Sequence, residues 1–184
     1  MKSLLIVAAS GALFVAGCAT TLQAHSDHDR GQNFSAYHTY AWMTDQPMVA
    51  TPDELTRVSP LNRHRIEQAI ENELATKGFQ KSTARAAADF VVSYTVGARD
   101  RVDVFSYPAP YGGPWRWGGP YFGHDVDVTM YREGTLAIDV FDGKNHQPVW
   151  HGWASKRISE HDLKHAAEQI PPAVALIMQD FPPR

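Results

Sequence analysis

The sequence predicts an α+β domain with the architecture of a two-layer sandwich: an antiparallel sheet with two helices packed on one face. Apolar and polar residues alternate over 88–96 and 134–141, which is typical of half-buried strands. Over 60–77, apolar residues recur instead at helical spacing. Strands kept apart from the helices and joined by connections of hairpin length favour this class.

The amino-terminal segment predicts export. Lys2 supplies a positive charge, and the apolar run Leu4–Phe14 fits a secretory signal core but is shorter than the ~20 residues that span a bilayer. The run leads into Val15-Ala16-Gly17-Cys18, which holds the only cysteine of the chain and resembles the lipobox of bacterial lipoproteins. The resemblance implies that residues 1–17 are a signal peptide, that a diacylglyceryl group joins the Cys18 sulfur, and that the new amino terminus is acylated. The alternative is ordinary cleavage, for example after Ala19, which releases a free periplasmic protein.

The residue after the cysteine indicates the membrane to which a lipoprotein is sorted. It is Ala19 rather than aspartate, a pattern similar to that of outer-membrane lipoproteins in enteric bacteria. The resemblance therefore implies a membrane partner: the lipid on Cys18 holds the protein on the periplasmic face of the outer membrane. Several acyl chains together hold a protein far more firmly than one, because each buried methylene contributes roughly 0.8 kcal/mol.

The remaining chain, residues 18–184, is long enough for one domain with its own core. Lys and Arg total 17 against 20 Asp and Glu, so no strong field of either sign exists to attract nucleic acid. With Cys18 committed to lipid no disulfide can form, and the stability must come from packing.

The first half of the domain contains one clear helix. Before it, Thr20–Ala24 can begin a strand, and alternating aromatic residues at the end of Phe34–Trp42 indicate another. Ser59 is a natural helix cap, and Pro60 suits the first helical position because its missing N–H is not needed there. Gly78 is placed to stop the helix. Its core-facing residues are Ile66, Ala69, Ile70 and Leu74.

The second half is predicted to be mostly sheet. A strand over 88–96 continues weakly to Val104 and is followed by an excursion at about 105–125 that is dense in Gly, Pro and aromatic residues. Proline and glycine at this density predict irregular structure. Strand character resumes at Val126–Tyr131. A hairpin then follows, with Leu136, Ile138 and Val140 facing the core, a turn at Asp142–His146 and a partner strand at Pro148–Ala154.

The chain closes in a helix that Ser159 caps. Pro171 and Pro172 lie within its periodic pattern, so a kink or a short second helix at Ala173–Asp180 is expected.

Taken together, these segments resemble one known family. Phe34–Trp42 is similar to its opening motif F-x-x-Y-x-T-Y-x-W, and Arg65–Phe79 to a helix that ends in K-G-F or K-G-Y. Asp89–Tyr94 resembles its second strand, while Glu133–Asp142 and Val149–Ala154 resemble its hairpin. The family is a group of bacterial lipoproteins, domain of unknown function 4136, and the likeness spans about residues 20 to 183. The resemblance implies an α+β domain of the cell envelope, and it implies no enzyme activity, cofactor or catalytic residue. In such proteins a first strand often precedes the opening motif.

The nine histidines raise the question of a metal. His161 and His165 lie four residues apart on the closing helix, a spacing that can present two imidazoles to one ion. No third ligand is indicated, so solvent-facing histidines are the simpler interpretation and no metal is expected. The His25–Asp29 segment can chelate copper or zinc weakly, although a polar segment needs no such role.

Acid–base catalysis is the next hypothesis. Glu133, Asp139 and Asp142 lie near one hairpin and can be drawn as an acid–base pair. Asp142 is explained better as turn chemistry, and Asp139 as the outward neighbour of Ile138. The sequence predicts no enzyme, and an envelope hydrolase is the remote alternative.

The excursion is the best candidate for partner binding. Interfaces are enriched in Tyr, Trp and Arg, and aromatic rings can also rest in a bilayer interface or stack on glycan sugars. The competing interpretation is a hairpin insertion whose rings fold onto the domain itself. The residues concerned are Tyr107, Tyr111, Trp115, Arg116, Trp117, Tyr121 and Phe122.

The expected function is therefore a non-catalytic, outer-membrane-anchored lipoprotein whose domain binds an envelope protein or glycan through one sheet face or the excursion. The alternative is a periplasmic carrier that holds a small hydrophobic ligand between sheet and helices.

Overall fold

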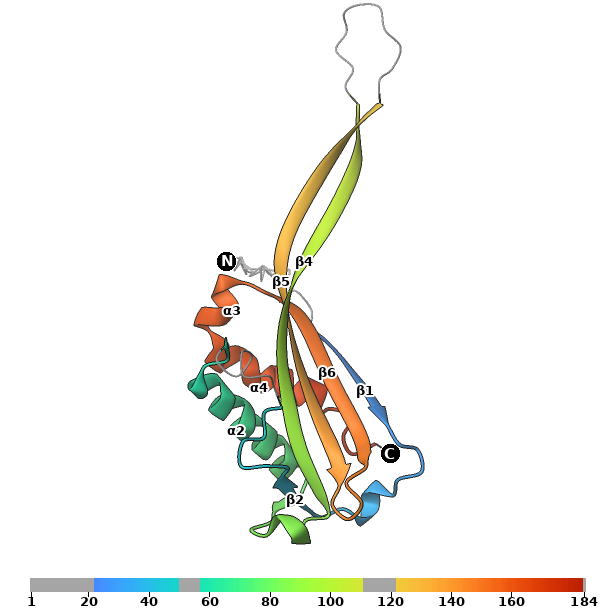
Figure 1. Cartoon of the computed structure of the whole chain (residues 1–184), viewed down its shortest axis with the longest axis vertical. Helices are drawn as coiled ribbons and strands as arrows, with labels where there is room; N and C mark the ends of the chain where they lie inside the picture. Colours follow the sequence, from blue (N-terminus) through green and yellow to red (C-terminus); the bar gives the residue numbers. More distant parts are fainter. Residues whose placement is uncertain (1–21, 50–56, 111–121, 184) are drawn as a thin grey trace, which may run out of the picture.

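The computed structural model describes residues 22–49, 57–110 and 122–183, and within them the chain has an α+β fold of one sheet and three α-helices (Figure 1). In chain order the elements are β1 (Gln23–His28), β2 (Thr39–Trp42), α2 (Pro60–Thr76), β3 (Gln80–Lys81), β4 (Phe90–Pro110), β5 (Phe122–Asp142), β6 (Pro148–Ile158), α3 (Glu160–Lys164) and α4 (Ala166–Ile177). The expected strand before Phe34 is β1, whereas Phe34–Ala36 itself forms a 3-10 turn.

The sheet is mixed, so the prediction of an antiparallel sheet is wrong. The described strands follow the order β1-β6-β5-β4-β2-β3, and β2 pairs in parallel with both β3 and β4. The chain leaves β2, runs through α2 and returns to the starting edge, which permits parallel pairing. Asp89 fixes the register: its carboxylate accepts hydrogen bonds of 2.9 Å from the His38 N–H, the Thr39 N–H and the Thr39 hydroxyl. The starts of β2 and β4 are thereby held side by side.

Helix α2 has the predicted beginning and end. The Ser59 hydroxyl accepts a hydrogen bond of 3.2 Å from the Asn62 N–H, and Pro60 occupies the first helical position. Gly78 has φ +90°, a left-handed conformation that glycine adopts without strain. The four apolar residues expected to face the core are all buried.

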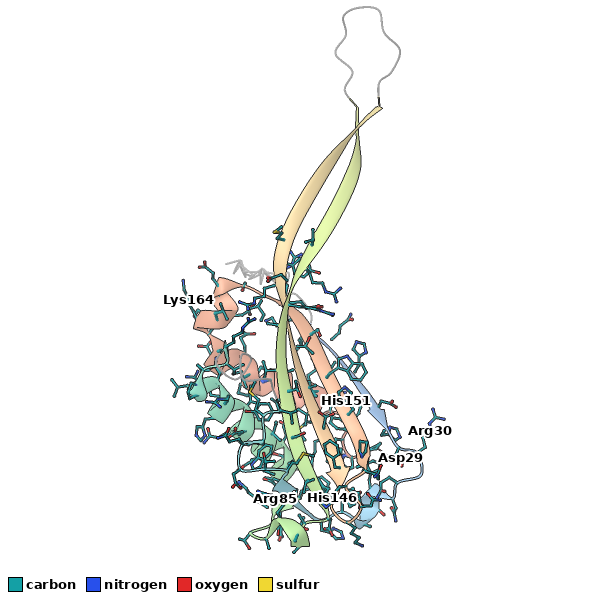
Figure 2. All side chains as sticks on the ribbon, viewed as in Figure 1. Asp29, Arg30, Arg85, His146, His151 and Lys164 are labelled. Atoms are coloured by element: carbon teal, nitrogen blue, oxygen red, sulfur yellow. The ribbon has the colours of Figure 1, made fainter. Side chains whose placement is uncertain are left out.

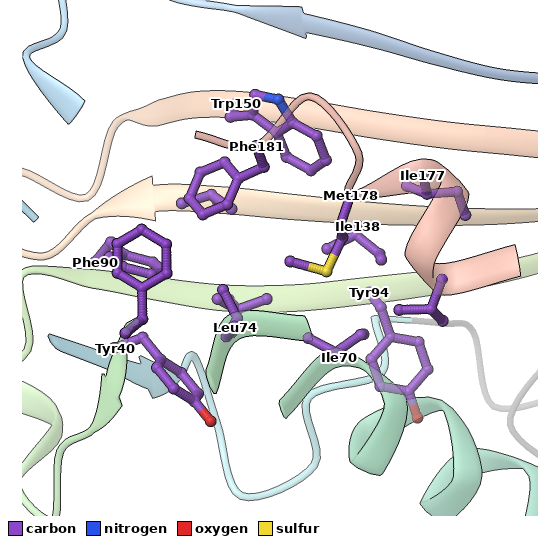
Figure 3. Close-up of a cluster of buried hydrophobic side chains, with 14 of the residues drawn as sticks. Tyr40, Ile70, Leu74, Phe90, Tyr94, Ile138, Trp150, Ile177, Met178 and Phe181 are labelled. Atoms are coloured by element: carbon purple, nitrogen blue, oxygen red, sulfur yellow. The ribbon is translucent and has the colours of Figure 1, made fainter. Parts of the chain in front are cut away.

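The core lies between the sheet and the helices α2 and α4, which gather on one side of it (Figure 1). At its centre the ring of Phe90 contacts that of Phe181 (Figure 3). Phe90 also contacts the rings of Tyr37 and Phe79. Ile138 and Val140 of β5 are fully buried beneath the helices, and Leu136 is partly buried against the same cluster, as the alternation predicts. Trp150 of β6 packs on Phe181 at the edge of this group.

Strands β4 and β5 continue well beyond the body of the sheet. Among the described residues, β6 accompanies β5 only as far as the pair Arg132 and Ile158. Further out, β4 and β5 pair with each other alone, as far as Pro110 and Phe122, and project as a two-stranded ribbon (Figure 1).

The expectation of irregular structure throughout 105–125 is therefore wrong for its flanks. Both strands of an isolated ribbon are edge strands, where proline is tolerated at positions whose missing N–H would face solvent. Pro108 and Pro110 lie two residues apart on β4, so the two backbone nitrogens that lack an N–H lie on the same edge of that strand.

The closing helix divides at a different place from the one expected. His165 leaves the helical region with φ −111° and ψ 28°, which separates α3 from α4, and α4 continues through Pro171 and Pro172. The prolines fall in the second turn of α4. The carbonyls that they leave without partners belong to Ala167 and Glu168, which are exposed, so that water can satisfy them.

Candidate functional site

A groove of about 470 Å³ lies between the sheet and the helices, toward the end of the body where β6 stops and the ribbon begins. Its floor is formed by β4, β5 and β6, and its wall by α2, α3 and α4. The residues that line it are Leu22, Arg57, Val58, Asn62, Ile66, Val96, Gly97, Ala98, Arg132, Gly134, Thr135, Leu136, Ala154, Lys156, Ile158, Asp162, Leu163, Ala166, Gln169, Ile170, Ala173 and Ile177.

Small residues on the sheet leave the space that forms the groove. Cross-strand pairing places Val96 opposite Leu136, and Ala98 opposite Gly134, on the face that the helices cover. On β6, Ala154 continues the row beside Leu136. A side chain at Gly134 would collide with Ile158, whose Cδ1 would lie 2.3 Å from an added Cβ. Glycine at this position therefore lets Ile158 lie across the floor.

Helix α3 stands beside the groove because of a reciprocal cap. The Asp162 N–H donates to the Ser159 hydroxyl at 3.2 Å, while the Ser159 N–H donates to the Asp162 carboxylate at 2.9 Å. The Lys156 ammonium on β6 also donates to Asp162, at 2.6 Å. This ion pair joins the floor of the groove to its wall.

The Lys156–Asp162 ion pair makes the stability of the domain dependent on pH. The hydrogen bond from Lys156, together with those from Ser159, lowers the pKa of Asp162 to about 2. Because the pKa of Asp162 is lower in the folded than in the unfolded chain, its ionised carboxylate stabilises the fold at a pH above its ordinary pKa. This stabilisation is lost as the pH falls from about 4 toward 2.

We expect Asp162→Asn to reduce the free energy of unfolding by about 2 kcal/mol at neutral pH and by almost nothing near pH 2. Urea unfolding at the two pH values measures this difference. Asp180→Asn, at an exposed position, is the control and should change the free energy by less than about 0.5 kcal/mol at either pH. A deficit of Asp162→Asn that persisted unchanged at low pH would contradict the assignment.

The residues predicted for lipidation and partner binding fall largely outside the described part of the chain. Tyr107 and Phe122 belong to β4 and β5, where the structure defines their main chain. Those outside the described residues are Cys18, Tyr111, Trp115, Arg116, Trp117 and Tyr121. For all of these the proposed roles stay predictions.

The histidine pair on the closing segment is stacked on itself. The rings of His161 and His165 lie 4.0 Å apart, and the His165 Nδ1 is 2.9 Å from the His161 carbonyl oxygen. His25 lies elsewhere, on β1, with its ring 5.4 Å from that of Trp153. No cluster of three potential metal ligands is present among the described residues.

The three acids considered for catalysis have three separate sets of partners along β5. Glu133 accepts hydrogen bonds from Arg101 at 2.7 Å and from Arg99 at 2.9 Å, which lower its pKa. Asp139 contacts the imidazole of His151 at 2.6 Å, on the sheet face away from the helices (Figure 2). The structure does not bring the acids together.

Asp142 has the structural role that its turn position indicates. It accepts hydrogen bonds from the Tyr37 hydroxyl at 2.8 Å and from the N–H groups of Lys144 and Asn145. Burial by itself would raise its pKa, but these hydrogen bonds together hold the pKa below the usual value. Burial, together with the same contact, raises the pKa of Tyr37.

The groove is the feature that reasoning from sequence did not locate, although a carrier with its ligand between sheet and helices was weighed. The available signal was the size of the inward-facing residues. Ala98, Gly134 and Ala154 occupy positions that the alternation assigns to the core, yet they are too small to fill it. Ala98 and Gly134 pair across two strands, Ala154 lies one row away on β6, and only this tertiary grouping turns their small size into a groove.

No helix in the described part of the chain combines the length and the apolar character needed to cross a membrane.

Solved structures with a similar fold include a DUF4136 family protein from Bacteroides thetaiotaomicron VPI-5482. It is 14% identical, with a TM-score of 0.51, and the match covers 87% of this chain and 94% of that one. A PDZ domain protein from Parabacteroides distasonis ATCC 8503 is 17% identical with a TM-score of 0.49; 88% of this chain matches 35% of that protein. PelC from Paraburkholderia phytofirmans, a dodecamer, is 12% identical with a TM-score of 0.44, covering 86% of this chain and 95% of PelC.

At these identities the likeness concerns the fold alone. No curated protein sequence matches this chain. The model of the family described as "Domain of unknown function (DUF4136)" matches residues 24–183, in agreement with the resemblance of the motifs. The chain therefore belongs to the DUF4136 family.

Proposed function

We propose that this protein is a non-catalytic, lipid-anchored domain of the bacterial envelope that binds one apolar chain of an amphiphile in the groove between sheet and helices. The groove carries the proposal. Its volume of about 470 Å³ lies within the range of about 300–1,000 Å³ that is usual for small-molecule sites.

The lining suits a hydrocarbon chain with a polar end. Leu136, Ile158 and Ile170 supply apolar surface from the floor and the wall. Arg132 is exposed, and no carboxylate among the described residues forms an ion pair with it. Each methylene removed from water contributes about 0.8 kcal/mol, so a modest length of chain accounts for useful affinity.

Replacing a small floor residue by a large one tests the groove. We expect Ala98→Trp to weaken binding of an anthroyloxy-labelled stearate more than tenfold, because displacing two methylenes costs about 1.6 kcal/mol. Fluorescence titration of residues 19–184 measures this affinity; the described core residues, with Leu22 and Ala24 that pack against them, lie between 22 and 181, so this form keeps them all.

Ala137→Trp is the matched control, since Ala137 lies on the neighbouring strand and points to the opposite face. It should bind the labelled stearate as the parent does. Equal affinity of both variants, or no binding by the parent, would refute the groove as a ligand site.

The localisation of the protein is part of the proposal and rests on the lipobox. The motif supports a diacylglyceryl anchor on Cys18, and Ala19 supports the periplasmic face of the outer membrane. Replacing Cys18 with alanine removes the thiol that would carry the lipid. We expect most of the protein then to move from the outer-membrane fraction, as followed by immunoblotting of separated membranes. Unchanged outer-membrane fractionation would contradict the anchor.

A second candidate function is docking of an envelope protein or glycan on the ribbon. Val102 and Met130 face each other across its two strands, and they are 54% and 78% exposed. Isolated two-stranded ribbons are marginally stable, so a partner that covers this pair would stabilise the ribbon. Photo-crosslinking in cells from positions 102 and 130 tests this function, and a single specific adduct would support it.

A further inference from the structure

We propose that the apolar chain in the groove is an acyl chain carried by the protein's own Cys18. The inference rests on the proposed function, and it names the source of the ligand. The groove would then shelter the anchor whenever the protein is away from a bilayer.

The distance along the chain supports this assignment. Leu22, the first described residue, lines the groove. Four residues of fully extended chain span at most about 14 Å, so the Cα of Cys18 lies within that distance of the Cα of Leu22 whatever path joins them. An acyl chain attached at Cys18 is therefore tethered within reach of the apolar lining.

The shape of the floor fits one chain better than a bulky ligand. Ala98 and Gly134 are cross-strand partners and form a low step in the floor between the larger residues Leu136 and Ile158, and Ala154 lies in the next row, beside Leu136. The same face of β4 and β5 continues outward to the exposed pair Val102 and Met130. On that face the pair Asp100 and Arg132 lies between them and the groove, so the apolar lining ends at a charged mouth.

Tethering favours the protein's own chain over a free amphiphile. A ligand joined by a short flexible segment has an effective concentration in the millimolar range. Free single-chain amphiphiles would have to reach that concentration to compete. A bilayer offers the same methylenes an equally apolar environment, so the chain would exchange between the groove and the membrane.

Photo-crosslinking of the full chain tests the inference. The protein is produced in bacteria that are fed a palmitate analogue bearing a diazirine and an alkyne, and is then purified into an amphipathic polymer without bilayer. On illumination we expect crosslinks within the same chain, to peptides of β5 and α4 that line the groove. Ala98→Trp should reduce these crosslinks at least fivefold, whereas Ala137→Trp should leave them unchanged.

Each other outcome overturns the inference in a distinguishable way. Labelled protein that crosslinks only to polymer or to neighbouring molecules shows that the anchor does not enter the groove. A free amphiphile found in the groove by native mass spectrometry of the lipidated chain identifies another occupant, and it leaves the proposed groove function intact. Protein without label at Cys18 removes the anchor and the inference together, whereas the stearate titration still decides the groove by itself.

Discussion

Replacing Phe90 with alanine is expected to lower the free energy of unfolding by about 3–5 kcal/mol, the usual cost of removing a buried phenylalanine. Phe90 is fully buried at the start of β4. Its ring centroid lies 5.1 Å from that of Phe79, 5.3 Å from Tyr37 and 5.6 Å from Phe181, so the substitution opens a cavity where three parts of the chain meet. Urea unfolding of residues 19–184 measures the loss.

Leu61→Ala provides the comparison, because Leu61 is also apolar but is 67% exposed on α2. Its cost should stay below about 0.5 kcal/mol, apart from the small difference in helix propensity. A Phe90→Ala variant as stable as Leu61→Ala would show that the ring cluster does not hold the domain together.

Replacing Gly143 with alanine is expected to cost about 2–3 kcal/mol, although only one methyl group is added. The Gly143 N–H donates a hydrogen bond of 2.8 Å to the Asp89 carbonyl oxygen, which draws the turn between β5 and β6 against the chain before β4. An added Cβ would lie 2.0 Å from the Ala88 carbonyl oxygen and 2.9 Å from the Asp89 carbonyl carbon. These are main-chain atoms, so the turn itself must move.

Gly97→Ala is the same substitution in open space. Apart from its two chain neighbours, no atom of the described residues lies within 4 Å of a Cβ built at Gly97. Its stability should change by less than about 1 kcal/mol, and a small gain is expected because alanine restricts the unfolded chain. Thermal unfolding of the two variants side by side provides the measurement, and equal melting temperatures would contradict the close approach at Gly143.

Elements with local signals at both ends were predictable from sequence. Helix α2 begins at a serine cap with a following proline and ends before a left-handed glycine, and all of these signals lie within the helix or next to it. The hairpin of β5 and β6 was predictable for the same reason, since Asp142 organises the turn through its nearest neighbours.

Elements that depend on distant contacts were not predictable in this way. The parallel pairing of β2 with β4 is held by Asp89 and Thr39, which lie 50 residues apart. The division between α3 and α4 is at His165 rather than at the prolines, because exposed carbonyls can lose their partners at little cost. The proline and glycine content also led to too short a prediction for β4 and β5, because a ribbon with two open edges tolerates proline that a central strand excludes.

The candidate site likewise has one part with a local sequence signal and one part that depends on distant contacts. The lipobox is a local motif and could be recognised from the sequence alone, although Cys18 lies outside the described residues. The groove depends instead on the alignment of Ala98 with Gly134 and on the place of α4 above them, neither of which is a property of any single segment.

The length of β4 and β5 has a mechanical consequence. Each strand runs without interruption from the buried core to the far part of the ribbon, so a pull on the ribbon reaches Ile138 through continuous main chain. The load would fall along the ladder that joins β5 to β6, where the hydrogen bonds lie across the direction of pull and must yield together. Tension applied through the ribbon would therefore load this ladder in shear, and the lifetime of the fold under such a load would be set by the rate of unfolding.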